Sequence, residues 1–121
     1  MANPNIVNVA TINGKTDVFA LTTSSANLVT ATANTVFKIN SILISNVDGS
    51  NAADTTVIYN DSSASANFHL AKTVTVPSKS TLVVMGKDSP IYLEEGDKIA
   101  ALASAASDLE IIVSWEELDD A

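Results

Sequence analysis

The residues able to carry chemistry are few in this sequence. His69 is the only histidine, and the 121 residues include no cysteine. His69 lies in the alternating run Phe68–Lys72, without the Gly-x-Ser-x-Gly elbow that presents a nucleophile. One histidine without cysteine also cannot complete a usual zinc site. We therefore expect no catalytic residue, no metal site and no bound cofactor, and we expect the protein not to be an enzyme.

Acidic side chains gather at two places where acid–base chemistry has to be considered. They lie in the segment Glu94–Asp97, a predicted turn, and in the C-terminal segment Glu116–Asp120. Glycosidases hold two carboxylates across a sugar-binding cleft, and such clefts are normally lined by aromatic side chains. Aromatic residues make up only 5% of this chain, so solvated acids are the favoured interpretation. We interpret the C-terminal group as a solvated tail, with docking on a basic partner as the alternative.

Oxygen-bearing side chains also lie close together in the loop Asp48–Asp54. Calcium binds such ligands, but the loop lacks the twelve-residue pattern and the closing bidentate glutamate of an EF-hand. A simple hairpin loop is therefore favoured, and calcium binding is left open. Asn60–Ser62 matches the acceptor pattern for N-glycosylation, which is a weak signal in a sequence without a secretion signal.

Charge and hydropathy narrow the class of partner. The formal net charge is −8, and arginine is absent. Nucleic acids and anionic membrane surfaces attract positive charge, and arginine is the usual bidentate ligand of phosphate, so neither is an expected partner. The N-terminus lacks the basic and apolar regions of a signal peptide, and no apolar run approaches the roughly 20 residues needed to span a bilayer. We expect a soluble protein.

Short alternating or apolar runs, separated by turn residues, predict an all-β fold. The last run is the clearest, because Leu109, Ile111 and Val113 point one way and Glu110 the other, with Ile112 as the exception. The spacing predicts an antiparallel β-sandwich of jelly-roll-like type. The expected strands are Ile6–Ile12, Val18–Thr22, Asn27–Ala31, Val36–Ser45, Thr55–Tyr59, Phe68–Val76, Ser80–Met85, Ile91–Leu93, Lys98–Ser104 and Leu109–Trp115.

Turn residues fix where the strands should end. Asn13–Gly14 is a two-residue hairpin signal between the apolar stretches on either side. Pro77 stops a strand, and Ser78–Lys79 makes the following turn. Gly96 is placed to take the positive φ that a tight turn needs. The alanine-rich segment Ala100–Ala106 lacks a cap and an apolar stripe, so we expect a strand and a turn there.

Bulky apolar residues are sparse up to about Asn34 and denser from Val36 onward. We therefore divide the chain into residues 1–34, an N-terminal arm or edge hairpin, and residues 35–121, a β-sandwich domain. The arm either reaches a neighbouring subunit by strand addition or folds back as edge strands of its own sandwich. We expect Trp115 in the core together with Phe37, Leu43, Val74 and Leu82, with an anchor for a partner near the C-terminal edge as the alternative.

Five segments of the second half resemble small virion structural proteins of tailed bacteriophages, especially those that infect marine cyanobacteria. The most specific is Tyr92–Asp97 (YLEEGD), followed by a strand and an acidic-aromatic end. The likeness covers roughly Val36 to Leu118 and concerns the fold rather than chemistry. The five segments are Phe37–Val47 (FKINSILISNV), the polar loop Asp48–Asp54, Leu70–Leu82 (LAKTVTVPSKSTL), Pro90–Ile99 (PIYLEEGDKI) and Ser104–Leu118 (SAASDLEIIVSWEEL).

This resemblance implies a β-sandwich that assembles on a capsid or a tail and carries no catalysis. The function expected from it is that of a capsid decoration (cement) subunit in the virion, held by strand and arm contacts. Its partners would be capsid or tail subunits and further copies of itself, with a trimer favoured. The alternatives are a tail, neck or baseplate component, or a module that binds a host surface or carbohydrate.

Overall fold

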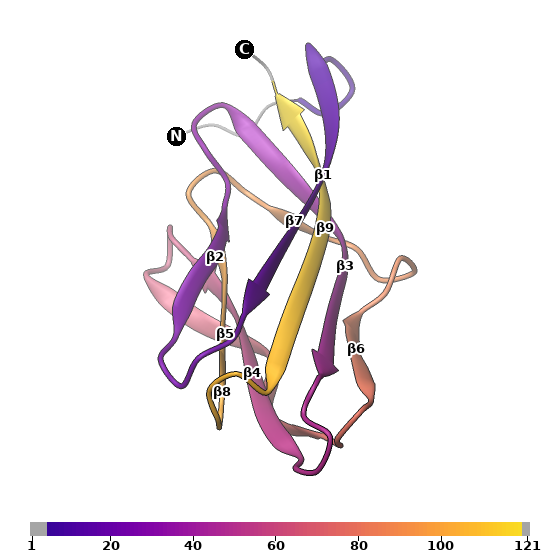
Figure 1. The fold of residues 1–121 in the computed structure, drawn as a ribbon. Coiled ribbons are helices and arrows are strands. Elements are labelled where there is room, and N and C mark those ends of the chain that lie inside the picture. The colour runs from indigo at the N-terminus through magenta and orange to yellow at the C-terminus, as the bar shows by residue number, and fades with distance from the viewer. Residues whose placement is uncertain (1–4, 120–121) are drawn as a thin grey trace.

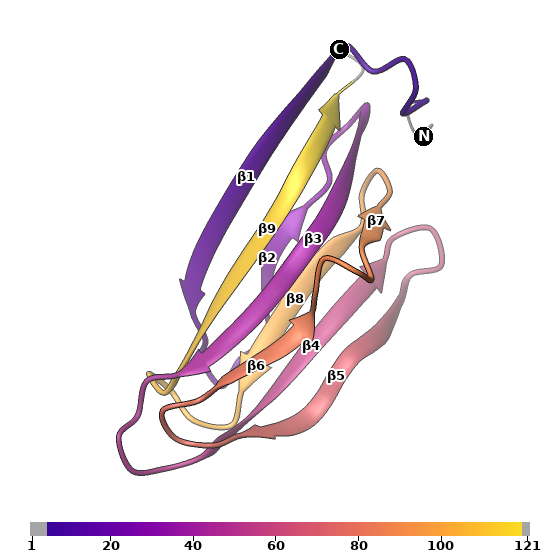
Figure 2. The same ribbon diagram turned by 90° about the vertical axis from the view of Figure 1, so that its right-hand side faces the viewer.

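The computed structural model describes residues 5–119, and all the regular elements of that part are strands. Within it, no helix is long and apolar enough to cross a membrane. The strands form two antiparallel sheets packed face to face. In Figure 1, β1, β9 and β3 lie in front and β8, β4 and β5 behind, and Figure 2 shows the two sheets from the side. The nine strands are β1 (Thr11–Ala20), β2 (Ala26–Thr30), β3 (Thr35–Asn46), β4 (Ala53–Asp61), β5 (Ala66–Val76), β6 (Thr81–Met85), β7 (Ile91–Leu93), β8 (Lys98–Ala103) and β9 (Leu109–Asp119).

The strand pairs are those of one long antiparallel hairpin that has been folded over. β4 pairs with β5 at its closed end, β3 pairs with β6 and β7, β2 pairs with β8, and β1 pairs with β9 at its open end. Folding the hairpin puts successive pairs into opposite sheets. Sheet A has the order β1-β9-β3-β6, and sheet B has the order β2-β8-β4-β5. This arrangement is a jelly roll, so the predicted fold class is confirmed.

The core lies between the sheets and consists of inward-facing aliphatic side chains. Ile42 and Ile44 of β3 and Ile111 and Val113 of β9 are fully buried, and β3 and β9 are paired along most of their length. These two strands occupy the middle of sheet A, which explains why their sequences are the richest in Ile and Val. The alternation predicted for β9 is confirmed over its whole apolar face.

The predicted Asn13–Gly14 hairpin is wrong. Both residues lie inside β1, where Asn13 is opposite Glu117 and Gly14 is opposite Glu116. A hairpin here would give two short strands, whereas a continuous β1 pairs with β9 over its full length. Residues 5–10 are not part of a strand, so the strand expected at Ile6–Ile12 begins only at Thr11. An edge strand tolerates glycine and asparagine because nothing packs closely beyond it.

The hairpin loop expected at Asp48–Asp54 is also wrong, because this loop joins β3 of sheet A to β4 of sheet B. The turns expected at Pro77, at Gly96 and in the alanine-rich segment agree with the structure. Gly96 has a φ of 89°, and Lys79 has a φ of 60° in the turn after Pro77. The alanine-rich segment contains β8 and then a turn. At the N-terminal end, β1 and β2 are edge strands of different sheets, each paired with a strand of the same chain. Residues 1–4 and 120–121 lie outside the described part, and with them the first residues of the proposed arm and Asp120.

Candidate assembly surface

An apolar row crosses the outer face of sheet A from edge to edge. Val18 of β1 is opposite Ile112 of β9, which is opposite Leu43 of β3, and Leu43 is opposite Val83 of β6. The side chains of Val18, Val83 and Ile112 are exposed by 67%, 60% and 38%. Directly opposite side chains on one face of a sheet contact each other, so these four residues, called the apolar row below, form one continuous strip.

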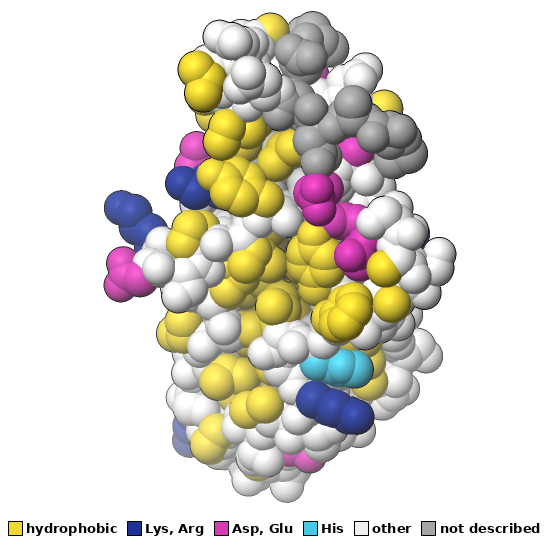
Figure 3. Space-filling model, turned by 180° about the vertical axis from the view of Figure 1, so that it is seen from behind, with side chains coloured by type: hydrophobic (Ala, Val, Ile, Leu, Met, Phe, Trp, Pro, Cys, Tyr) yellow, Lys and Arg dark blue, Asp and Glu magenta, His cyan; other side chains and the backbone are white. Residues whose placement is uncertain are grey.

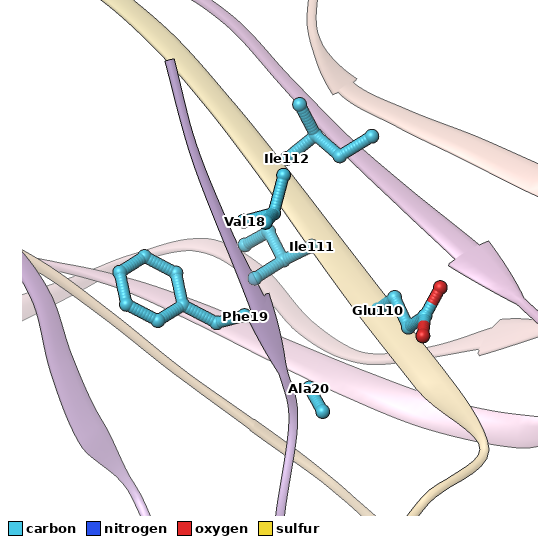
Figure 4. Close-up of a pocket in the computed structure, with 6 residues that line it drawn as sticks. All are labelled: Val18, Phe19, Ala20, Glu110, Ile111 and Ile112. Carbon is cyan, nitrogen blue, oxygen red and sulfur yellow. The ribbon is translucent and has the colours of Figure 1, made fainter. Parts of the chain in front are cut away.

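Small and polar side chains surround the apolar row. The Thr16 hydroxyl lies 2.9 Å from the Ser114 hydroxyl on one side of the row, and Ala20 is opposite Glu110 on the other. Val18 and Ile112 line a shallow hollow with these last two residues, and Phe19 points away from them (Figure 4). The outer face of sheet A therefore has an apolar centre between polar positions, and it has the chemistry of a contact surface.

The outer edge of sheet A is also open. β1 is a ten-residue strand whose residues are exposed apart from Phe19, which is partly buried against the core. Within residues 5–119 its only strand partner is β9, so its second edge presents unpaired backbone groups. Long exposed edges of this kind are templates for pairing with another chain.

A buried polar cluster around Asp97 connects three segments at one end of the sandwich. The Asp97 side chain in the β7–β8 turn is 2% exposed. It accepts hydrogen bonds from the Tyr59 hydroxyl and from the backbone N–H groups of Ser62 at 3.0 Å and Glu94 at 3.3 Å. Burial, together with the hydrogen bond to Asp97, raises the pKa of Tyr59 well above its ordinary value. The cluster joins β4, the β4–β5 turn and the β7–β8 turn, and we assign it a structural role.

The acidic side chains singled out in the sequence have separate partners in the structure. Glu95 accepts the N–H of Asn34, and Glu116 accepts the side-chain amide of Asn40 at 3.1 Å. Glu117 accepts the indole N–H of Trp115 at 3.2 Å. Asp97 belongs to the buried cluster. Among the described residues, these four carboxylates therefore each accept from a different group.

The remaining candidates lie on the surface. His69 is exposed on β5, and Figure 3, seen from the sheet B side, shows it at the margin of a face whose centre is hydrophobic. Asp48 accepts the N–H groups of Ser50 and Asn51, which lowers its pKa. Asp54 accepts the Thr75 hydroxyl at 2.7 Å. Within residues 5–119 no group of three or more His, Asp or Glu side chains is placed to hold a metal ion.

Trp115 lies where the sequence predicts. Its side chain is 5% exposed, and its ring stacks on Phe37 with 5.8 Å between ring centroids and 20° between planes. The prediction of a core residue is confirmed. The other residues expected beside it are less deeply placed, because Leu43, Val74 and Leu82 are only partly buried. Leu43 instead belongs to the apolar row on the outer face.

Sequence reasoning missed the apolar row and the Asp97 cluster. The signal for the row was Ile112, the one residue that broke the alternation of its strand, but its neighbours across the sheet come from three distant segments. The signal for the cluster was an aspartate directly after a turn glycine. Nothing in the local sequence distinguishes a buried aspartate at that position from a solvated one.

Neither a family model nor a curated protein matches the sequence. Solved structures that resemble the fold include one of a phage capsid and one of bacterial pili. One is the acid-stable capsid structure of the Helicobacter pylori bacteriophage KHP30, with a TM-score of 0.53, 9% identity and coverage of 94% of this chain and 92% of that one. The other comes from Bacillus endospore appendages, a family of disulfide-linked pili, with a TM-score of 0.54, 12% identity and coverage of 92% and 88%. At these identities the similarity shows the fold alone.

Proposed function

We propose that this chain is a non-catalytic structural subunit of a bacteriophage virion, in which it decorates the capsid and stabilises the particle exterior. The observation that carries the proposal is the apolar row, which spans all four main strands of sheet A and is open to solvent. A rigid jelly roll with an apolar outer face can bind a capsid surface through that face, and such binding needs neither a cleft nor a conformational change.

Composition and comparison support this assignment. The chain carries a net charge of −8 and no arginine, so a place on the particle exterior avoids attraction to packaged DNA. Its fold resembles a chain of a phage capsid structure over nearly its full length. The absence of catalysis stays part of the proposal, and the single histidine, exposed on β5, is the residue whose substitution should leave assembly intact.

A specific observation favours a second candidate, a subunit of an extracellular fibre. The fold resembles a chain of the Bacillus endospore appendages to a similar degree. Those appendages are disulfide-linked, whereas this chain has no cysteine. A fibre built from it would therefore be held by non-covalent contacts alone, such as strand pairing and apolar packing.

Substitution of the exposed valines tests the proposal. Val18→Ser and Val83→Ser remove apolar surface from the row, and Val47→Ser removes it from the β3–β4 loop, where the valine is 54% exposed. Burial of a valine of this exposure contributes about 1–2 kcal/mol, so each row variant should bind particles lacking the protein about tenfold more weakly. Val47→Ser should bind like the wild type. Equal binding by all three variants, each folded by circular dichroism, would contradict the proposed surface.

A further inference from the structure

We infer that the free edge of β1 pairs with the β1 edge of a second copy of this chain, antiparallel and about a twofold axis at Thr16. The contact extends sheet A of one subunit into sheet A of the other. It is independent of the proposed function, because a free homodimer, a decoration subunit and a fibre subunit could each use it.

Two opposite charges lie on the open edge of β1. Lys15 and Asp17 lie two residues apart on the inward side of β1, where both line the hollow between β1 and β2. Both are exposed. Lys15 is 3.8 Å from Glu117 of its own chain, whereas Thr16 between them faces outward to Ser114. The edge therefore carries one positive and one negative side chain on the same face, symmetrically about Thr16.

Strand geometry limits how two copies of this edge can pair. In an antiparallel pair, directly opposite residues point to the same face. Two identical strands related by a twofold axis perpendicular to the sheet therefore place the axis on a residue and not between residues. The registers that keep nearly the whole of β1 paired have their axis at Lys15 or at Thr16.

Charge selects between these registers. With the axis at Lys15, the two lysines face each other and repel. With the axis at Asp17, the pairing is shorter and the two aspartates face each other. With the axis at Thr16, each Lys15 is opposite the Asp17 of the other copy, so two opposite-charge pairs form on one face. The sequence of the edge is therefore self-complementary in one register.

On the other face of the paired edge, the side chains that meet include small ones. In this register Val18 is opposite Gly14 of the other copy, and nothing lies within 4 Å of a side chain built at Gly14. Ile12, 58% exposed in the free chain, is opposite Ala20. The apolar rows of both subunits then lie on the same face of one continuous sheet. The trimer favoured from the sequence would need a different contact, because pairing of an edge with its own copy closes at two subunits.

Charge reversal at the edge tests the inference in the full chain. Lys15→Asp makes both positions negative, Asp17→Lys makes both positive, and the double variant restores opposite charges in swapped order. All four forms carry Glu117→Gln, so that residue 15 does not face a carboxylate of its own chain while the bond from Trp115 keeps an acceptor. The dimer dissociation constant is measured by sedimentation at several protein concentrations, with circular dichroism to confirm folding.

We expect each single reversal to weaken the dimer at least tenfold and the double variant to recover the parent affinity within about threefold. An equimolar mixture of the two single variants should form heterodimers, because their edges carry opposite charge. A parent protein that stays monomeric at millimolar concentration would overturn the inference, as would single variants that dimerise like the parent. A folded double variant that does not recover the parent's dimer affinity would overturn the proposed register.

Discussion

Replacing Trp115 with alanine should remove a large part of the stability of this protein. The indole is 5% exposed, stacks on Phe37 and donates to Glu117. Tryptophan-to-alanine changes in cores cost about 3–5 kcal/mol. Trp115 also lines the hollow between β1 and β2, so water can fill part of the space left by the ring, and we expect about 3 kcal/mol. Domains of this size have about 5–15 kcal/mol in total.

Trp115→Phe is the matched control, because it keeps a ring against Phe37 and loses the bond to Glu117. It should cost about 1 kcal/mol from the lost hydrogen bond, in addition to a smaller packing loss. Urea unfolding followed by far-UV circular dichroism measures both variants, since the only tryptophan is removed and its fluorescence is unusable. The urea concentration at the midpoint of unfolding should fall, while the dependence of the unfolding free energy on urea concentration should stay constant. A loss below about 0.5 kcal/mol for Trp115→Ala would refute the core assignment.

Two further predictions concern stability. The folded state raises the pKa of Tyr59 above its ordinary value of 10.0. The protonated hydroxyl therefore contributes fully to the free energy of unfolding below about pH 10, and this contribution is lost as the pH rises further. In the wild type the free energy of unfolding, measured by urea titration, should fall between about pH 9 and pH 11, and Tyr59→Phe should reduce this fall. The same pH dependence in both proteins would contradict the bond to Asp97. Thr73 has a φ of 52° in β5, a strained conformation for a β-branched residue. Thr73→Gly should therefore leave the melting temperature unchanged or raise it. Thr75→Gly, in the extended part of β5, should lower the melting temperature by several degrees, because it loosens an extended backbone and removes the bond to Asp54. A loss for Thr73→Gly as large as that for Thr75→Gly would exclude strain at Thr73.

The strands could be predicted from the sequence because their signals are local. The alternation in Leu109–Trp115, the stop at Pro77 and the turn at Gly96 each depend on a few adjacent residues. The Asn13–Gly14 hairpin failed for a non-local reason, since the pairing of β1 with the far end of the chain outweighs the turn preference. The twelve-residue β3 was foreseen almost to its ends for the opposite reason, because its own apolar residues, from Val36 to Ile44, mark the strand.

The contact surfaces could not be predicted because they depend on register between distant strands. The apolar row combines Val18, Leu43, Val83 and Ile112, and no segment of the sequence contains two of them close together. The acidic segments were visible in the sequence, but their hydrogen-bond partners Asn34, Asn40 and Tyr59 lie in other strands and loops. Sequence patterns therefore predicted the strands, and pairing between distant strands determined the candidate surfaces.

The most direct test of the proposed function is the copy number of this protein in purified virions, measured by quantitative mass spectrometry against the major capsid protein. A capsid decoration subunit should be present at hundreds of copies per particle, in a fixed ratio to the capsid lattice. A dozen copies or fewer would assign it to a tail or neck instead of the capsid. Its absence from particles would contradict a structural role in the virion.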